Sequence, residues 1–347
     1  MGRVGMDTTS FMYGPVVRIS GAEGVMTASA TRKLHRWDNP FTRTVGRLID
    51  RKEVYPRPQA LRYGMLCAMP ELPEVERGRR IAMKVVLGRR ITEARCTDDP
   101  IVFEGVPASR FRKALLGRRV LAVKRHGKHL WFELDRRPWP CLHFGMTGGF
   151  HTSPGGPRVK LKSSAKSPDR AWPPRFTKLQ LVFDDGGELI VADARRLGRI
   201  RLRHDPAHEP PISLLGFDAH RALPPFSAFR DLVRQRGAPL KALLLDQSFA
   251  AGVGNWIADE VLYQARLDPR RRANTLADPE IARMRAALKR VIDTSVRLSN
   301  DSDRYPSGWL FHRRWGKNPR AVTRTGERIR HITLGGRTTA WVPTRQR

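Results

Sequence analysis

Met69-Pro-Glu-Leu-Pro-Glu-Val-Glu76 is the stretch of this chain that says most about its fold and function. Good helix formers follow it and Gly88 is a stop signal, so the sequence predicts a helix from Glu74 to Leu87. A carboxylate on the first turn of that helix favours the helix dipole. Pro70 lies inside the chain, so its nitrogen belongs to an amide that carries no proton and is not nucleophilic. A chain that began at Pro70 would instead expose a secondary amine.

The second strong feature is charge. The 347 residues carry a formal net charge of +32, which makes the compact state repel itself and is explained most simply by a polyanionic partner. Lysine and arginine displace counterions from phosphates, so nucleic acid is favoured over a membrane surface or a ribosome. Cys67, Cys96 and Cys141 are too scattered for a metal-type pair or a disulfide framework, so a reducing compartment is expected. No apolar run approaches the roughly 20 residues that span a bilayer, so we expect no membrane helix.

Residues 1–68 form a leader that is rich in Arg, Thr, Ser and Gly and has few acidic residues. It shows no sustained hydrophobic period, so it is expected to be poorly structured. Two interpretations remain open. The composition is typical of an organelle transit peptide, whereas the position of Met69 directly before Pro70 favours sequence upstream of the true start. The first predicts a mitochondrial or chloroplast protein and the second a nuclear one.

Short runs with strand character follow the first helix, at 120–123, 129–132, 178–183 and 189–191. The last two flank the turn Asp184-Asp-Gly-Gly187, which predicts a hairpin. Several short strands separated by turn signals predict a β-sandwich. Residues 69–204 are therefore expected to form one catalytic domain. A loop at 153–174, rich in Pro, Gly, Ser and Lys, interrupts it and is expected to be mobile.

The segment 205–225 is expected to be a linker, because it carries five prolines. Beyond it the hydrophobic period becomes helical, and helices are predicted at 226–236, 240–247, 256–265 and 280–298. Two further strands within 329–342 are joined at Gly335-Gly336. The sequence thus predicts an α+β protein. It has an N-terminal two-sheet β-sandwich flanked by helices, a helical domain at 226–300 and a finger with a β-hairpin at 301–347.

These features resemble one known family, the formamidopyrimidine-DNA glycosylase/endonuclease VIII enzymes of DNA repair, which begin much as residues 69–76 do. Further segments match that family at the right distances: Lys124-Arg-His-Gly-Lys-His129, His143-Phe-Gly-Met-Thr-Gly148, Asp193-Ala-Arg-Arg-Leu-Gly198, Lys241-Ala-Leu-Leu-Leu-Asp-Gln247 and Ala251-Gly-Val-Gly-Asn-Trp-Ile-Ala-Asp-Glu260. The last two resemble the family's helix–two-turn–helix element. The resemblance runs from about Met69 to Pro343.

The resemblance implies a catalytic group. In that family the exposed N-terminal proline attacks the sugar C1′ of a damaged nucleotide and forms a Schiff base, so Pro70 is expected to be the nucleophile. Glu71 would move protons at the sugar and base, with Glu74 beside it, and Lys128 would contact the phosphate beside the lesion. The residues alone leave other interpretations open. Both glutamates can cap a helix, and Lys128 can be an exposed hairpin lysine.

The same resemblance implies DNA-binding residues. Met146 would fill the gap left by an extruded base, Arg195 would pair with the orphaned opposite base, and Leu197 would wedge, with Arg196 beside them. Seen alone, Met146 can equally be a flexible core filler. Many family members have phenylalanine where Leu197 stands. Because leucine cannot stack as an aromatic ring does, a weaker preference for the opposite base is expected.

Lys241 and Asn255 would hold phosphates around the lesion, at a turn whose glycines allow phosphate to approach the next helix start. The C-terminal hairpin resembles the zincless finger of plant, fungal and some animal relatives. No cysteine follows Cys141, so a thiolate zinc site is impossible there. Arg337 at the turn would bind phosphates flanking the flipped nucleotide. The isolated histidines of this region, His312 and His331, are expected at the surface or on phosphate, and neither a metal nor another cofactor is expected.

The sequence therefore predicts a bifunctional DNA glycosylase/AP lyase for oxidised purines, namely formamidopyrimidine, 8-oxoguanine and hydantoins. It would act as a monomer on double-stranded damaged DNA, through a proline Schiff base and β,δ-elimination. The alternative is a non-catalytic DNA- or RNA-binding protein that keeps the fold without a free proline.

Overall fold

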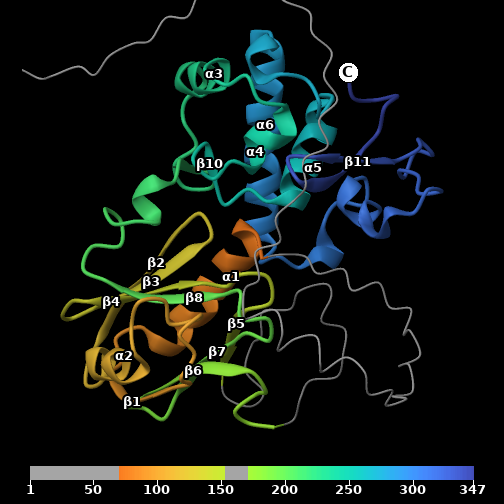
Figure 1. Ribbon diagram of the computed structural model, residues 1–347. Helices are drawn as coiled ribbons and strands as arrows, with labels where there is room; N and C mark the ends of the chain where they lie inside the picture. Colours follow the sequence, from red (N-terminus) through yellow and green to blue (C-terminus); the bar gives the residue numbers. More distant parts are fainter. Residues whose placement is uncertain (1–69, 153–170) are drawn as a thin grey trace, which may run out of the picture. The chain divides into compact units, whose positions relative to one another are not determined.

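The computed structural model describes residues 70–152 and 171–347, which belong to one compact unit of the chain (Figure 1). The leader 1–68 and most of the predicted loop 153–174 lie outside the described residues. Helix α1, Leu72–Val86, begins two residues before its predicted start. Pro73 lies in its first turn, where the missing N–H costs no helical hydrogen bond.

Within the described residues, the N-terminal part contains two four-stranded antiparallel sheets. The first has the order β1-β6-β7-β5, with bounds Ile91–Cys96, Thr177–Phe183, Glu188–Ala192 and Gly149–Thr152. The second has the order β2-β3-β4-β8, with bounds Val120–His126, His129–Leu134, Trp139–His143 and Arg199–Arg203. The predicted hairpin is the β6–β7 pair. The predicted strands at 120–123 and 129–132 belong to β2 and β3, which pair across the turn at Gly127.

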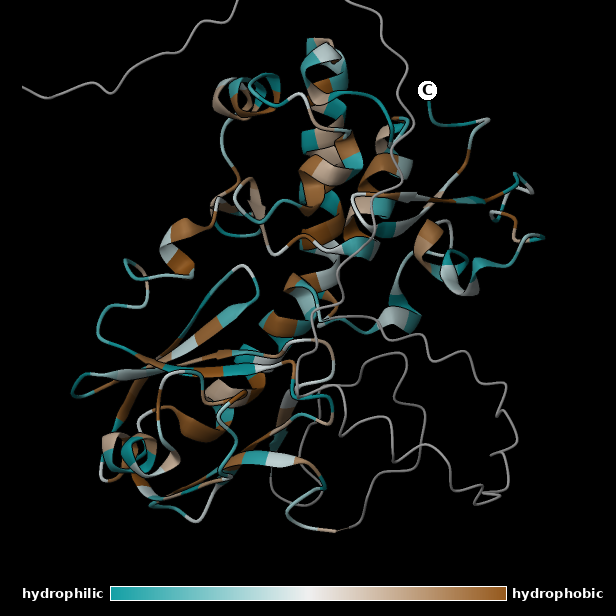
Figure 2. Cartoon of the chain, viewed as in Figure 1, coloured by the Kyte–Doolittle hydropathy of each residue, from teal (hydrophilic) through white to brown (hydrophobic). Residues whose placement is uncertain are grey.

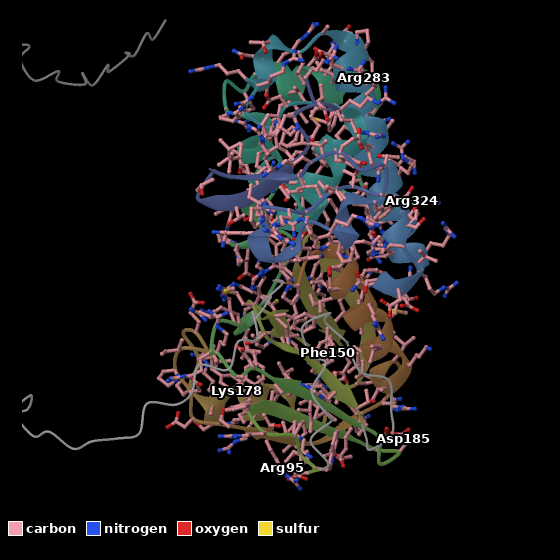
Figure 3. All side chains as sticks on the ribbon, turned by 90° about the vertical axis from the view of Figure 1, so that its right-hand side faces the viewer. Arg95, Phe150, Lys178, Asp185, Arg283 and Arg324 are labelled. Atoms are coloured by element: carbon pink, nitrogen blue, oxygen red, sulfur yellow. The ribbon has the colours of Figure 1, made fainter. Side chains whose placement is uncertain are left out.

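The two sheets share one hydrophobic core, so the predicted sandwich is confirmed. Phe132 of the second sheet and Phe150 of the first are both buried, with ring centres 6.1 Å apart. Helices α1 and α2, Ala108–Leu115, add buried side chains to the same core. Figure 2 shows hydrophobic residues concentrated on the strands and central helices. In Figure 3, Phe150 lies among the strands, whereas Arg95 and Asp185 lie at the outer edge.

The segment 205–225 does more than connect. Its 3-10 turn η2, Ile212–Leu214, places Ile212 against Trp131 and Cys141 on the outer face of the second sheet. The short strand β9, Phe217–Asp218, then pairs in parallel with β10, Ala250–Ala251. The proline-rich segment is therefore anchored at Ile212 and at β9.

The predicted helices are confirmed as α3 Phe226–Arg234, α4 Leu240–Leu245, α5 Asn255–Ala265 and α6 Asp278–Arg297. They surround a second core that includes Phe229, Trp256 and Leu288, all essentially inaccessible to solvent. The final strands β11, Arg330–Leu334, and β12, Arg337–Trp341, form the predicted hairpin, which packs against α5 (Figure 1). The connecting 3-10 turns are η3 Ala273–Thr275, η4 Ser302–Arg304, η5 Leu310–His312 and η6 Trp315–Lys317. Among the residues the structure describes, no helix is long and apolar enough to cross a membrane.

Candidate active site and DNA interface

The N-terminus of α5 holds a carboxylate from a distant part of the sequence. One oxygen of Glu71 accepts the Trp256 N–H at 2.8 Å, and the other accepts the Ile257 N–H at 3.1 Å. Amides in the first turn of a helix have no partner within it, so Glu71 caps α5, where the helix dipole favours a negative charge. Burial nevertheless raises the pKa of Glu71, because the loss of water outweighs the charge of Lys128 and the two amides.

Two glycines make this close approach possible. A Cβ on Gly254 would lie 2.3 Å from Cδ of Glu71, so any side chain there would displace the carboxylate. Gly252 has a φ of +98°, and its carbonyl accepts the Leu72 N–H at 3.1 Å, which fixes the start of α1 to the turn before α5. Gln247 stabilises the same turn, since its side-chain oxygen accepts the Gly252 N–H at 3.1 Å.

Glu74 lies directly behind Glu71. Its Oε2 accepts the Glu71 N–H at 3.1 Å and so caps α1. Burial, and then the negative charge of Glu71, raise the pKa of Glu74 to about 8. Both glutamates are therefore helix caps, as one interpretation of the sequence had it. Capping leaves them as a close carboxyl pair in which Glu74 holds a proton at neutral pH.

Lys128 occupies the turn between β2 and β3 and points toward the same helix start. Its Nζ donates to the Val253 carbonyl at 2.9 Å, and its side chain is half-buried. Burial lowers the pKa of Lys128, and Arg337 lowers it further, whereas Glu71 and Glu74 oppose both. The interpretation of Lys128 as an ordinary exposed hairpin lysine is therefore wrong.

A cleft of about 390 Å³ brings four of the predicted site residues together. They come from the start of α1, the β2–β3 turn, the start of α5 and the finger hairpin, and they are Pro70, Lys128, Asn255 and Arg337. Asn255 also ties two of these elements, because its Nδ2 donates to the Thr338 carbonyl at 3.0 Å. Arg337 is exposed at the hairpin turn. The cleft thus combines a proline, an ammonium and a guanidinium above a buried carboxyl pair.

Two histidines that line this cleft were not among the predicted site residues. His129 and His143 face each other across β3 and β4, with ring centres 4.7 Å apart. Burial lowers the pKa of His129 to about 3 and that of His143 to about 4, and neighbouring cations add to both shifts. The Gly145 N–H donates to Nδ1 of His143 at 3.2 Å, so the neutral ring carries its hydrogen on Nε2.

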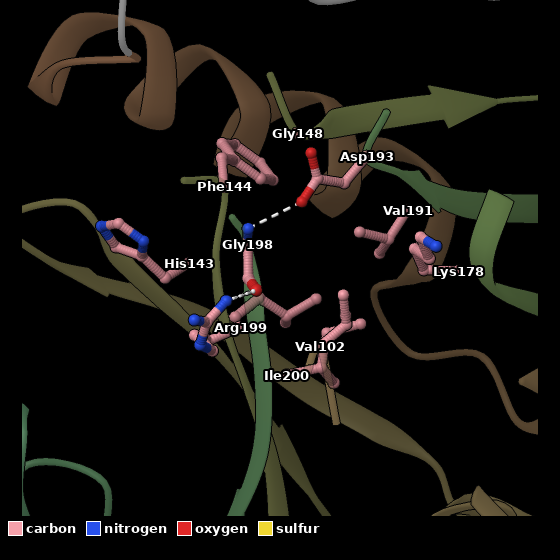
Figure 4. Close-up of a pocket in the computed structure, with 11 residues that line it drawn as sticks. Val102, His143, Phe144, Gly148, Lys178, Val191, Asp193, Gly198, Arg199 and Ile200 are labelled. Atoms are coloured by element: carbon pink, nitrogen blue, oxygen red, sulfur yellow. Dashed lines mark hydrogen bonds between the residues drawn. The ribbon is translucent and has the colours of Figure 1, made fainter. Parts of the chain in front are cut away.

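The remaining predicted DNA contacts lie on two loops that Asp193 holds together (Figure 4). Its carboxylate accepts the Thr147 hydroxyl at 2.7 Å and the Gly198 N–H at 2.7 Å. The loop 144–148 carries Met146, which is half-buried, and the loop 193–198 carries the exposed Arg195 and Leu197. Arg196 is exposed as well, but it forms an ion pair with Asp99 at 2.9 Å.

Lys241 is not placed where the sequence predicted. Its side chain is fully buried, and its Nζ donates to Asp259 at 2.5 Å and to the Asn255 carbonyl at 2.8 Å. Asp259 also accepts Arg314 at 2.6 Å and the Ala340 N–H at 3.0 Å. A phosphate cannot reach an ammonium in this closed ion pair. Lys241 therefore joins α4, α5 and the finger instead of holding DNA.

A second buried ion network joins the sandwich to the segment 205–225. Arg125 of β2 is inaccessible to solvent and pairs with Glu76 at 3.0 Å and with Asp218 at 2.6 Å. Asp218 also accepts the Gly127 N–H at 2.8 Å, which fixes the turn that carries Lys128. The sequence offered no clear signal for this network, because Arg125 lies between Lys124 and His126 in a basic segment.

The finger shows no arrangement that would hold a metal ion among the residues described, where no group of three or more His, Cys, Asp or Glu side chains gathers. Nε2 of His312 donates to the Tyr305 carbonyl at 3.2 Å, and Nε2 of His331 donates to the Arg314 carbonyl at 3.1 Å. Both histidines thus stabilise backbone, and their predicted surface or phosphate role stays a prediction.

Comparison with known proteins explains why these elements meet. Residues 69–200 match the model of the formamidopyrimidine-DNA glycosylase N-terminal domain, and residues 215–306 match that of its H2TH, or helix–two-turn–helix, domain. The chain belongs to the formamidopyrimidine-DNA glycosylase family.

Relatives and solved structures agree with this assignment. A formamidopyrimidine-DNA glycosylase of Arabidopsis thaliana is 40% identical over 279 residues, which cover 80% of this chain and 71% of that protein. One from Thermus thermophilus is 36% identical over 80% of this chain and 98% of its own length. The Lactococcus lactis enzyme, solved bound to DNA containing an AP site, has a TM-score of 0.66 and 25% identity over 80% of this chain and 99% of its own. The two family models cover the cleft residues from Pro70 to Asn255, whereas Gly335 and Arg337 of the finger lie beyond residue 306.

Proposed function

We propose that this protein is a bifunctional DNA glycosylase/AP lyase that removes oxidised purines, with Pro70 as the nucleophile. The observation that carries the proposal is the cleft, in which Pro70 lies with Lys128, Asn255 and Arg337 above the buried Glu71. The relatives named above are glycosylases, and a neighbouring structure with a TM-score of 0.66 and 26% identity holds DNA with a carbocyclic analogue of 8-oxoguanine.

The residues of the cleft suit successive steps of this reaction. The amine of Pro70 would attack C1′ of the flipped nucleotide, the base would leave, and the resulting Schiff base would allow β,δ-elimination of the flanking phosphates. Burial raises the pKa of Glu71, which suits a carboxyl that gives and takes a proton. Lys128 and Arg337 would neutralise the phosphates beside the flipped nucleotide.

Pro70 needs a free amine for this role, and within the full chain it has an amide. We therefore propose that the active form starts at Met69 and that removal of this methionine exposes Pro70. A chain that keeps residues 1–69 would have the DNA-binding surface without the nucleophile, so the non-catalytic alternative describes that form. We further propose that the active protein is a monomer in the nucleus. Its finger would hold no metal, since no cysteine follows Cys141.

The test is excision by a chain that begins at Pro70, on duplexes that carry formamidopyrimidine, 8-oxoguanine, a hydantoin or no lesion. We expect base release and strand cleavage on the damaged duplexes alone, without added metal. Binding to all four duplexes without base release from any of them would favour the non-catalytic alternative.

A further inference from the structure

Phe176 is an exposed aromatic residue in a strained backbone conformation. It is the residue directly before β6. Its φ is +65°, and 47% of its surface is exposed. A bulky residue with positive φ is a genuine outlier, and such strain persists only where the surroundings enforce it, often at functional sites. Packing does not explain the ring, because nearly half of it faces solvent.

The surroundings of Phe176 hold this conformation. Its carbonyl accepts the Asp193 N–H at 3.0 Å, and the next residue, Thr177, donates its hydroxyl to the Pro174 carbonyl at 2.6 Å. The guanidinium of Arg175 lies 4.7 Å from the centre of the Phe176 ring. The backbone thus presents an aromatic face and a stacked cation together at the surface.

Asp193 places this pair beside the two loops with the predicted DNA contacts. Its backbone N–H holds Phe176, while its carboxylate holds Thr147 of one loop and Gly198 of the other. Met146 lies next to Thr147, and Leu197 next to Gly198. Three loops with apolar side chains at or near the surface therefore meet at one aspartate.

The chemistry of the loops suggests what the ring contacts. Leu197 is exposed but has no aromatic face, so it can wedge between bases without stacking on them. Phe176 supplies the missing face on the neighbouring loop, and Arg175 supplies a charge for phosphate. Aromatic rings stack on any base because every base has a π-face, and a nearby arginine strengthens the contact.

We propose that Phe176, together with Arg175, stacks on a nucleotide of the strand opposite the lesion, beside the nucleotide that Leu197 contacts. The proposal rests on the proposed function, because it needs a damaged duplex in the cleft. It assigns to Phe176 a part of the opposite-strand recognition that Leu197 alone cannot provide.

The experiment uses the full chain and a duplex with a tetrahydrofuran abasic analogue, which needs no free proline amine. 2-Aminopurine is placed beside the orphaned base in the opposite strand, or at the matching place in the damaged strand. Phe176→Asn removes the ring but suits the left-handed backbone, Phe176→Gly does the same, and Phe176→Tyr keeps the ring. Leu121→Ala is the control, since Leu121 is 55% exposed on β2 at the end away from Lys128.

We expect Phe176→Asn and Phe176→Gly to bind the abasic duplex at least about fivefold more weakly and to lose the fluorescence change in the opposite strand. Their thermal midpoints should stay at or above that of the natural chain, whereas Phe176→Tyr and Leu121→Ala should bind normally. Unchanged affinity and fluorescence in both ring-free variants would overturn the proposal, as would a change confined to the damaged strand. Failure of the natural chain to prefer the abasic duplex over an intact one would instead overturn the proposed function, and this proposal with it.

Discussion

Helix α5 contacts two buried charge clusters that differ in how fully their charges are neutralised. At its first turn, two backbone amides of the helix donate to Glu71. The nearby Lys128 donates to the Val253 carbonyl at 2.9 Å and forms no ion pair with Glu71. One turn later, Asp259 accepts Lys241 at 2.5 Å and Arg314 at 2.6 Å. We call the first the open cluster and the second the closed cluster.

The difference shows what each cluster can do. The closed cluster satisfies its charges internally, so it can fix the finger on α5 but has nothing left for a ligand. The open cluster includes carboxyls with raised pKa values and borders a cleft, which is how acid–base sites are usually arranged. Both clusters contain a lysine and a buried acid, but the lysine of the closed cluster is fully buried and ion-paired, whereas Lys128 is half-buried and bonded to a carbonyl.

The largest effect is expected at the open cluster. Glu71→Gln should lower base excision by roughly 10²- to 10⁴-fold, because an amide cannot give or take a proton. Affinity for an abasic duplex should change little, since the amide oxygen can still accept one N–H at the start of α5. Excision rates and binding constants of a chain that begins at Pro70 test both halves. Excision at the natural rate would make Glu71 a helix cap and nothing more.

The closed cluster should respond in stability. Lys241→Met leaves Asp259 with one cation fewer in a fully buried site, and we expect a loss of about 3–5 kcal/mol in unfolding free energy. Lys128→Met removes a half-buried lysine that makes one hydrogen bond, and should cost about 1 kcal/mol or less. Denaturant unfolding of both variants makes the comparison. Equal losses would mean that the two clusters do not differ as described.

The pH dependence of stability should expose Glu74. The folded protein holds its proton up to about pH 8, whereas the unfolded chain releases it near the ordinary value of 4.5. Its stabilising effect is therefore fully present below about pH 4.5 and is lost as pH rises through about 8. Other acids add their own slopes, so the useful quantity is the difference between the natural chain and Glu74→Gln. That difference should shift in favour of the glutamine variant by at most about 1.4 kcal/mol per pH unit across this window. Parallel stability curves between pH 5 and 8 would rule out a buried proton at Glu74.

The smallest effect is expected at the rim of the cleft. Arg337→Ala should weaken binding to damaged and intact duplex by similar factors and lower the salt dependence of the affinity by about one unit. Met146→Ala removes no charge, so its salt slope should stay unchanged while binding to the lesion duplex weakens. Salt titrations of both variants distinguish these roles. An altered slope for Met146→Ala, or none for Arg337→Ala, would contradict the assignments.

Local patterns predicted much of this fold. The helical period gave α3 to α6 close to their true bounds, and alternation with turn signals gave the β6–β7 hairpin. These features depend on neighbours in sequence. The carboxylate cap of α5 joins residues 185 positions apart, so no local pattern could contain it.

The errors have the same origin. Lys241 was predicted on phosphate because of its motif, yet its neighbours Leu240, Leu243 and Leu244 are all buried, and a lysine in such a run needs a buried acid. His129 and His143 come together in the cleft only through the register of β3 and β4, which pairs residues 14 positions apart. The sequence shows which residues are charged, whereas the partner of each charge, such as Asp259 for Lys241, is set by tertiary packing.

The claim that Pro70 is the nucleophile is tested most directly by borohydride trapping on abasic DNA, with the mass of the cross-linked peptide. A chain that begins at Pro70 should yield DNA attached to its N-terminal peptide, and the full chain from Met1 should yield none. Efficient trapping by the intact full chain, confirmed by mass, would contradict this account and move the nucleophile to a lysine.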